Sequence, residues 1–251
     1  MSYTGDRSAL IQFYDRWAAE ELGHNYEART RVLDWKSRIL TEVVPVGQQI
    51  RNVLEVGCAE GRLLKGIVDH FGLPRGVGVD ITPRFIRIAA KSFPNLSFCL
   101  FDGRTIPIAA KSFDIVICSD VLEHVPALGV FLDELKRVAY ATLFKIPLEK
   151  SWLTTFRWMI GRGSGKGLDH PAGHFHEFSY RDAHHLLGQH GFRIRSFSLV
   201  CPPVEIQHAF TPPSQWSRHP SYLAQKLLEK VTPSSCVPVL GGALFAYCDN
   251  E

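Results

Sequence analysis

Hydrophobic side chains recur at every third or fourth position between Ser8 and Val44. This period places them on one face of a helix, as in amphipathic helices that pack against a core. Further along the chain, short apolar runs replace the helical period. The change predicts an N-terminal helical cap over residues 1–48, followed by one larger domain over residues 49–251.

Strand-like and helix-like patterns alternate from residue 49 to residue 148. The strand-like runs read NVLEVG, GVGVD, LSFCLFD, FDIVICS and YATLFKIP, and the helix-like runs between them read GRLLKGIVDHF, PRFIRIAAKSF and ALGVFLDELKRVA. This alternation is typical of βαβ units and a parallel sheet. Two later runs, FRIRSFSLV and GALFAYCD, have the character of further strands. We therefore expect an α/β fold built on a mainly parallel sheet.

The alternation stops in residues 149–178, and a long insertion in a compact domain is often a lid or a binding loop. We expect this insertion to cap a ligand site. Its apolar residues could form a wall over a ligand or could equally pack against the domain. These residues are Trp152, Phe156, Trp158 and Met159. Its cations fit either an anion site or a solvated loop, and they are Lys150, Arg157, Arg162 and Lys166.

Composition and charge change this picture little. The 251 residues are 45% hydrophobic and 21% charged, with a net charge of +3, which is ordinary for a globular protein and does not favour a nucleic-acid partner. The start of the chain shows no signal-peptide pattern and no apolar run long enough to span a membrane, so we expect a cytoplasmic protein. Six scattered cysteines without a C-x-x-C pair suggest neither a zinc site nor a disulfide framework.

The run VLEVGCAEGRLL places a glycine turn between a strand and a helix. A dinucleotide fingerprint, G-x-G-x-x-G, would place Ala59 and Arg62 at its second and third glycine positions, which counts against a dinucleotide. No lysine-hydroxyl pair follows Gly61, which disfavours a nucleoside triphosphate. The pattern that fits is E-x-G-x-[GA]-x-G, from Glu55 to Gly61.

With this turn, the sequence resembles the class I S-adenosylmethionine-dependent methyltransferases. Asp80 ends the second strand, where the family's acidic residue holds the ribose hydroxyls, and Asp102-Gly103 resembles its adenine-contacting step. The run IPIAAKSFDIVICSDVLEHV resembles the signature around the family's fourth strand. The resemblance spans about residues 52–146. It implies a Rossmann-like fold with helices on both faces of a seven-stranded, mostly parallel sheet, FRIRSFSLV and GALFAYCD as its final pair, and an antiparallel last strand.

The resemblance also implies a site for S-adenosylmethionine and its product S-adenosylhomocysteine. Its residues would be Glu55, Gly57, Cys58, Ala59, Gly61, Asp80, Ile81, Asp102, Gly103 and Ser119. Glycines without a Cβ allow close approach to the backbone, and a carboxylate can accept two hydrogen bonds from a diol. Taken singly, a glycine after a strand can be only a turn, and Asp80 can be only a helix cap before Pro83.

The candidate catalytic residues are His124, as base or acceptor contact, and His174 in HFHEFS. If SDVLEHV is helical, Asp120, Glu123 and His124 share one face. The histidine can equally be a structural pocket residue. Ubiquinone-biosynthesis and small-RNA methyltransferases carry a similar metal-binding step, so Asp120, Glu123, His124 and His174 form an alternative divalent-metal site, which we do not favour.

Methyl transfer to a hydroxyl of a small molecule, such as a natural product or saccharide, is the function we expect, with an amine as second choice. The alternatives are a metal-dependent RNA or catechol-type O-methyltransferase, and a non-catalytic homologue that only binds S-adenosylmethionine. The sequence does not indicate the acceptor or the oligomeric state.

Overall fold

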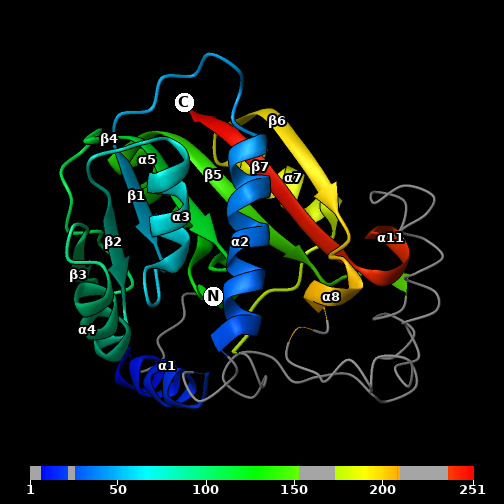
Figure 1. The fold of residues 1–251 in the computed structure, drawn as a ribbon. Coiled ribbons are helices and arrows are strands. Elements are labelled where there is room, and N and C mark those ends of the chain that lie inside the picture. Colours follow the sequence, from blue (N-terminus) through cyan, green and yellow to red (C-terminus); the bar gives the residue numbers. More distant parts are fainter. Residues whose placement is uncertain (1–6, 22–25, 153–172, 208, 210–236) are drawn as a thin grey trace.

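The structure is a computed structural model that describes residues 7–21, 26–152, 173–207, 209 and 237–251 (Figure 1). Its helices are α1 (Arg7–Glu21), α2 (Tyr26–Glu42), α3 (Arg62–His70), α4 (Pro83–Ser92), the 3-10 turn η1 (Leu122–His124), α5 (Leu128–Val138), α7 (Tyr180–Gln189), α8 (Val204–Gln207) and α11 (Val237–Leu240). Its strands are β1 (Val53–Val56), β2 (Val77–Asp80), β3 (Ser97–Leu100), β4 (Phe113–Ser119), β5 (Ala139–Leu148), β6 (Phe192–Val200) and β7 (Gly242–Asn250).

Seven strands form one sheet in the order β3-β2-β1-β4-β5-β7-β6. The first five strands run parallel to one another, whereas β7 lies antiparallel between β5 and β6. The expected sheet, including its antiparallel last strand, is therefore confirmed. The order reverses between β1 and β4, and ligands of open α/β sheets bind at such a switch point, beyond the carboxyl ends of the strands.

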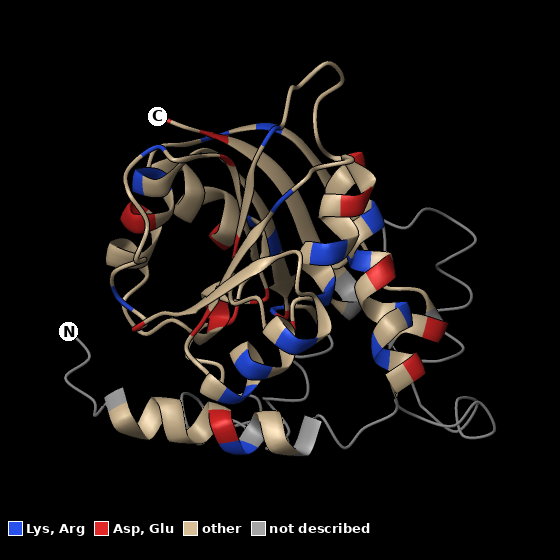
Figure 2. Ribbon diagram, turned by 60° about the vertical axis from the view of Figure 1, so that its left-hand side comes forward, with Lys and Arg blue, Asp and Glu red and all other residues tan. Residues whose placement is uncertain are grey.

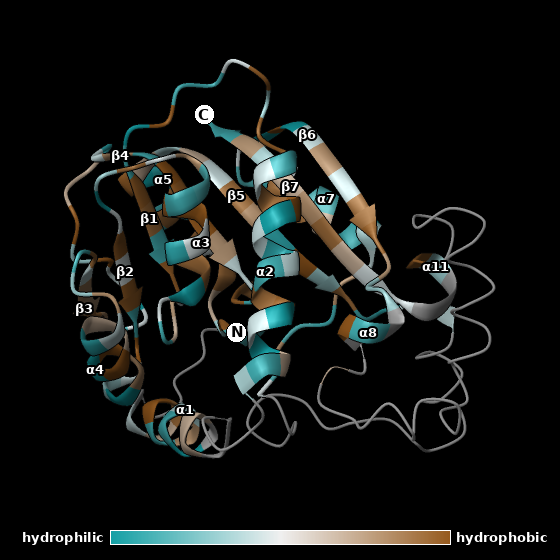
Figure 3. Cartoon of the chain, viewed as in Figure 1, coloured by the Kyte–Doolittle hydropathy of each residue, from teal (hydrophilic) through white to brown (hydrophobic). Residues whose placement is uncertain are grey.

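Helices cover both faces of the sheet. On each face, a separate apolar core lies between the sheet and its helices. One core packs α2 and α3 on the sheet through residues such as Trp35, Leu40 and Ile67. The side of α2 turned toward the viewer in Figure 3 is mostly hydrophilic, and charges of both signs follow one another along this helix (Figure 2). The helical period that the sequence showed is thus that of a helix with one buried face, and α2 packs directly on the sheet.

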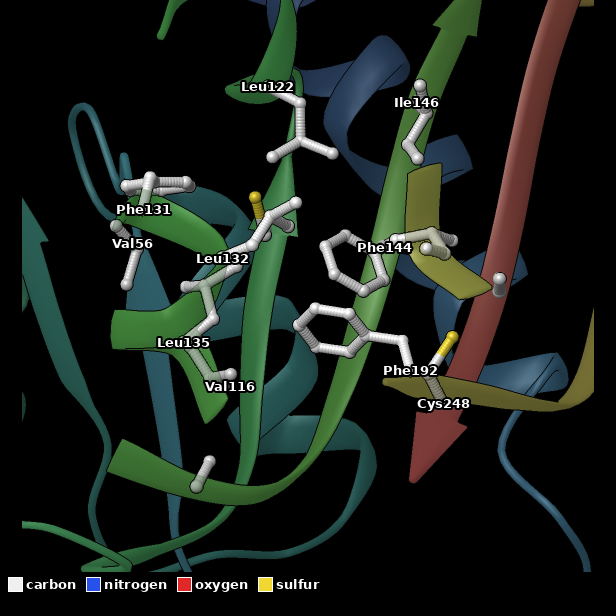
Figure 4. Packing of buried hydrophobic residues seen from close by; sticks show 14 of the residues in the cluster. Val56, Val116, Leu122, Phe131, Leu132, Leu135, Phe144, Ile146, Phe192 and Cys248 are labelled. Carbon is white, nitrogen blue, oxygen red and sulfur yellow. The ribbon is translucent and has the colours of Figure 1, made fainter. Parts of the chain in front are cut away.

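The second core lies beneath α5 and α7. Leu132 and Leu135 of α5 face Val116 of β4, and the rings of Phe144 and Phe192 meet edge to face at 5.1 Å (Figure 4). These side chains are almost completely buried, and each contributes about 1.5–3 kcal/mol by leaving water. The two cores hold the carboxyl ends of the parallel strands rigidly in place, which is what a binding site needs.

Local sequence signals explain where several helices begin. Pro83 is the first residue of α4, where its missing N–H is not needed. At α7, Ser179 and Asp182 form a reciprocal capping box, with Ser179 Oγ accepting from Asp182 N. The helix predicted at PRFIRIAAKSF is therefore confirmed as α4.

Some predictions fall on residues that the structure does not describe. Most of the insertion lies there, including Phe156, Trp158 and Met159. Trp152, at the start of the insertion, is exposed. The division into a cap over residues 1–48 and a domain over residues 49–251 stays a prediction. Within the described ranges, no helix is both long and apolar enough to cross a membrane.

Candidate active site

The glycine turn after β1 folds tightly against its neighbours. The amide groups of Gly57 and Cys58 donate to Val79 O at 2.8 and 3.1 Å, which ties the turn to β2. Gly57 has a φ of 76°, and a Cβ there would lie 2.5 Å from Val121 Cγ2. Gly61, with φ 78°, would place a Cβ 2.6 Å from the ring of Phe98. Both positions therefore require glycine, which leaves the turn's backbone open to a ligand.

Two buried carboxyl groups flank this turn. Glu55 is 3% exposed, and within the described structure its Oε2 has no hydrogen-bond partner. Burial raises its pKa well above the usual value, and Asp80 raises it further. Asp80 accepts hydrogen bonds from Ala59 N at 2.9 Å and Thr82 N at 2.8 Å. Burial raises the pKa of Asp80 too, although these two amides oppose the shift.

A cavity of about 620 Å³ opens at this edge of the sheet. Of the predicted cofactor residues, Glu55, Gly57, Cys58, Ala59, Asp80, Ile81, Gly103 and Ser119 line it. Gly61 and Asp102 do not line it. Gly61 instead precedes α3 and packs against Phe98, and Asp102 Oδ1 accepts from Arg104 N and Thr105 N at 2.8 and 2.7 Å.

A network of charged side chains connects helix α2 to the glycine turn. The sequence analysis did not predict this network. Arg29 of α2 pairs with Glu60, and Arg62 Nε donates to the other oxygen of Glu60 at 2.5 Å. The guanidinium of Arg62 also lies 4.0 Å from the centre of the Tyr26 ring, a cation–π contact. Since Arg29, Glu60 and Arg62 line the cavity, this network forms part of its wall.

The segment SDVLEHV is not an α-helix, so the expected helical face of Asp120, Glu123 and His124 is wrong. Asp120 adopts a left-handed conformation with φ 54°, and only Leu122 to His124 form a short 3-10 turn. The left-handed residue turns the chain sharply after β4. The partners of Asp120 are therefore Lys36 of α2 and Lys145 of β5, and not Glu123 or His124.

The two predicted histidines do come together across the cavity. Their ring centres are 4.8 Å apart, and both line the cavity. His124 Nδ1 donates to Gly173 O at 3.4 Å, because a carbonyl oxygen can only accept. The segment that carries His174 is held by Phe175 N, which donates to Glu123 O at 2.7 Å. Backbone pairing between distant segments thus assembles this cluster.

His174 has a carboxylate partner that the sequence analysis did not select. Nδ1 of His174 donates to Glu149 Oε2 at 2.9 Å. Glu149 directly follows β5, so its carboxylate sits at the same sheet edge as the glycine turn. Burial lowers the pKa of His174, but the hydrogen bond and charge of Glu149 outweigh it and leave the pKa raised. A pair of this kind fixes the tautomer of the imidazole and stabilises its protonated form.

Burial acts in opposite directions on the neighbouring acid and base. It raises the pKa of Glu123 to about 8, helped by the negative charge of Asp120. It lowers the pKa of His124 to about 4, helped by His174. Both groups are therefore neutral near pH 7. Of the histidine pair, only His174 is placed to change charge in the physiological range.

Only three of the four predicted metal ligands lie close enough together to share a metal ion. Glu123, His124 and His174 each offer one ligand atom within 4.8 Å of one another. Asp120 does not join them, because its carboxylate is held between Lys36 of α2 and Lys145 of β5. The isolated Lys145 in an otherwise apolar strand is the one sequence signal that could have revealed this contact.

The fold and the cavity define a class of protein. A glycine turn after the first strand, an acid after the second and a ligand cavity at the switch point are the features of Rossmann-like enzymes that bind a nucleoside cofactor. A family model described as a methyltransferase domain matches residues 54–140. Residues 54–140 thus carry a methyltransferase domain of the class I S-adenosylmethionine-dependent family.

Relatives and a solved structure agree with this placement. Norajmaline N-methyltransferase of Rauvolfia serpentina is 25% identical over 133 residues, which is 51% of this chain and 45% of that protein. Ubiquinone biosynthesis O-methyltransferase of Coxiella burnetii is 31% identical over 80 residues, 30% of this chain and 33% of that protein. The chain thus spans less than half the length of these curated relatives.

Magnesium protoporphyrin IX methyltransferase from Synechocystis, solved with bound SAH, shares the fold over 97% of this chain and 100% of that one. The TM-score is 0.62 at 13% sequence identity. This likeness extends the shared fold well beyond residues 54–140.

Proposed function

We propose that the protein transfers a methyl group from S-adenosylmethionine to a hydroxyl of a small molecule, with an amine as second choice. The observation that carries this proposal is that one cavity contains both the glycine turn with Glu55 and Asp80 and the pair of His124 and His174. A volume of about 620 Å³ lies within the range of about 300–1,000 Å³ usual for small-molecule sites.

The residues around the turn fit the cofactor. The unpartnered oxygen of buried Glu55 is suited to a cationic group, and a cation arriving beside it would favour its ionised form. The carboxylate of Asp80 uses one acceptor position on each oxygen for the two amides, and a carboxylate has about four such positions. Asp80 can therefore still accept from a ribose diol. When bound, S-adenosylmethionine supplies a methyl group made electrophilic by its sulfonium.

His174 is the better placed of the two candidate bases. Because its Nδ1 donates to Glu149, the neutral imidazole is basic at Nε2, and Glu149 stabilises the charge that forms when a proton is taken up. His124 is the weaker base, because burial holds its pKa at about 4. We assign His174 the removal of the acceptor proton, Glu149 the orientation of His174, and His124 a contact to the acceptor.

Metal-assisted transfer is a second candidate function, favoured by one observation. Glu123, His124 and His174 are close enough to share a divalent ion. Such an ion would lower the pKa of a bound hydroxyl. The cluster offers one carboxylate and two imidazoles, a ligand set that suits several transition metals better than Mg²⁺.

Binding and transfer can be tested in one series. S-adenosylhomocysteine is titrated calorimetrically into the protein, and transfer from a tritiated methyl donor is measured on a panel of phenols, alcohols and amines. We expect binding in the wild type. In His174→Gln we expect transfer to fall at least 100-fold with unchanged cofactor affinity, and in the control His184→Gln, an exposed position on α7, no change. Equal rates in wild type and His174→Gln would refute the assigned base.

Two further outcomes separate the alternatives. Transfer that is lost with EDTA and restored by a divalent ion would support the metal-assisted reaction. Binding of S-adenosylhomocysteine without transfer to any acceptor would identify a binding homologue. Absence of binding would remove the proposal as a whole.

A further inference from the structure

A buried charge centre lies in the same cavity, and the proposed reaction does not use it. The carboxylate of Asp120 lies between two ammonium groups, with Lys36 Nζ 2.7 Å from Oδ2 and Lys145 Nζ in contact with Oδ1. The side chains of Lys36 and Lys145 are only 19% and 11% exposed, and both line the cavity. We call these three residues the lysine centre.

The lysine centre is rigidly built. Asp120 N donates to Lys145 O at 3.0 Å, and Ser119 Oγ donates to Asp120 Oδ2 at 3.2 Å. Asp120 also has the left-handed φ of 54° described above, a conformation that non-glycine residues hold only where their surroundings impose it. The position of the carboxylate is therefore set by β4 and β5, and the two lysines converge on it from α2 and β5.

The centre carries more positive than negative charge. Two ammonium groups share one carboxylate, and each ammonium can donate three hydrogen bonds. The other acids nearby are Glu55, which interacts with Lys36, and Glu123, which interacts with Lys145. Among the described residues, neither carboxyl group forms an ion pair with either lysine, whose ion-pair partner is Asp120. Two buried ammonium groups thus share one carboxylate in the cavity, and a buried cation is costly unless an anion pairs with it.

The sheet order places this charge on the acceptor side. The cofactor residues Glu55 and Asp80 stand on β1 and β2, whereas Lys145 stands on β5, beyond β4. Glu149, the partner of the proposed base His174, follows the same strand as Lys145. An anion bound at the lysine centre would therefore lie beside the base and away from the ribose end of the cofactor.

We propose that the lysine centre binds a carboxylate of the methyl acceptor, so that the acceptor is a hydroxy acid. This inference rests on the proposed function, because it names the substrate class of the same site. The amino-acid tail of the cofactor carries a carboxylate as well. The experiment must therefore distinguish these two sources.

The test compares hydroxy acids with their neutral amides. A panel of aromatic and aliphatic hydroxy acids, each paired with its amide, is titrated calorimetrically into the full chain, with and without S-adenosylhomocysteine. We expect at least one acid to bind tenfold or more tighter than its amide. This preference should disappear in Lys145→Gln and in Lys36→Gln. It should persist in Lys65→Gln, which removes an ion-paired lysine from the exposed side of α3.

Two outcomes of these titrations overturn the proposal. These outcomes are equal binding of every acid and its amide in the wild type, and a preference that survives both lysine variants. If both variants weaken S-adenosylhomocysteine and leave the acid preference intact, the centre holds the cofactor's carboxylate. If Lys145→Gln fails to fold, the acid preference of Lys36→Gln, a variant of α2, is the test of the proposal. If the wild type prefers the acids but transfers no methyl group in the assay described above, the proposed function is wrong and the proposal of an anion site is retained.

Discussion

The buried carboxyl group of Glu123 should make the stability of this protein fall as the pH rises. Glu123 is 2% exposed, and one of its oxygens has no hydrogen-bond partner among the described residues. Burial, followed by the charge of Asp120, raises its pKa from 4.5 to about 8. The folded state thus keeps a proton that the unfolded chain releases above pH 4.5.

The size of the effect follows from linkage. Because the pKa is raised in the folded state, the stabilisation is complete below pH 4.5 and is lost as the pH passes 8. Between these values the wild type should lose about 1.4 kcal/mol of unfolding free energy per pH unit from this group. Glutamine has the shape of the protonated acid and cannot ionise. The Glu123→Gln variant should therefore gain about 3 kcal/mol relative to the wild type between pH 5.5 and pH 7.5.

Urea unfolding at pH 5.5, 6.5 and 7.5 measures this difference. The matched control is Glu134→Gln, because hydrogen bonds from Arg137 lower the pKa of Glu134 and the group is ionised in both states throughout this range. Its stability difference from the wild type should not change with pH. His124, whose folded-state pKa is about 4, titrates over this range only in the unfolded chain, and this contribution is shared by the wild type and both variants and cancels from the differences. Parallel curves for the wild type and Glu123→Gln would refute the burial of a protonated Glu123.

Three further predictions concern the cofactor side of the cavity. In Gly57→Ala the new Cβ meets Val121 at 2.5 Å, so urea unfolding should show a loss of about 1–3 kcal/mol, whereas Gly188→Ala, in open space, should show none; equal losses would contradict this. Asp80→Ala should weaken S-adenosylhomocysteine binding by about 1.5–3 kcal/mol in calorimetry, and unchanged affinity would remove the ribose assignment. Because the pKa of Glu55 is raised, binding of S-adenosylmethionine should release a proton in the wild type and none in Glu55→Gln, as measured by calorimetry in buffers of different ionisation enthalpy. Identical proton release in the two proteins would contradict the role of Glu55.

The cofactor side of the site could be read from the sequence because its signals are local. Glu55, Gly57 and Gly61 lie within seven residues of one another, and each has a role that the backbone of a single turn imposes. The strands and helices around them follow from hydrophobic period and from helix starts such as Pro83. These patterns involve only residues that are close together in the sequence, so they can be recognised without knowledge of the fold.

The acceptor side depended on the tertiary structure. His174 meets Glu149 across 25 residues of sequence, and Lys36 meets Asp120 across 84 residues. The assumption of a helix at SDVLEHV failed because the left-handed turn at Asp120 is held by its contact with Lys145. The sequence by itself determined the sheet, the cofactor turn and the candidate histidines. Only the packing of α2, β4 and β5 decided which charges meet, because the free energy of a buried charge depends on neighbours that no local pattern specifies.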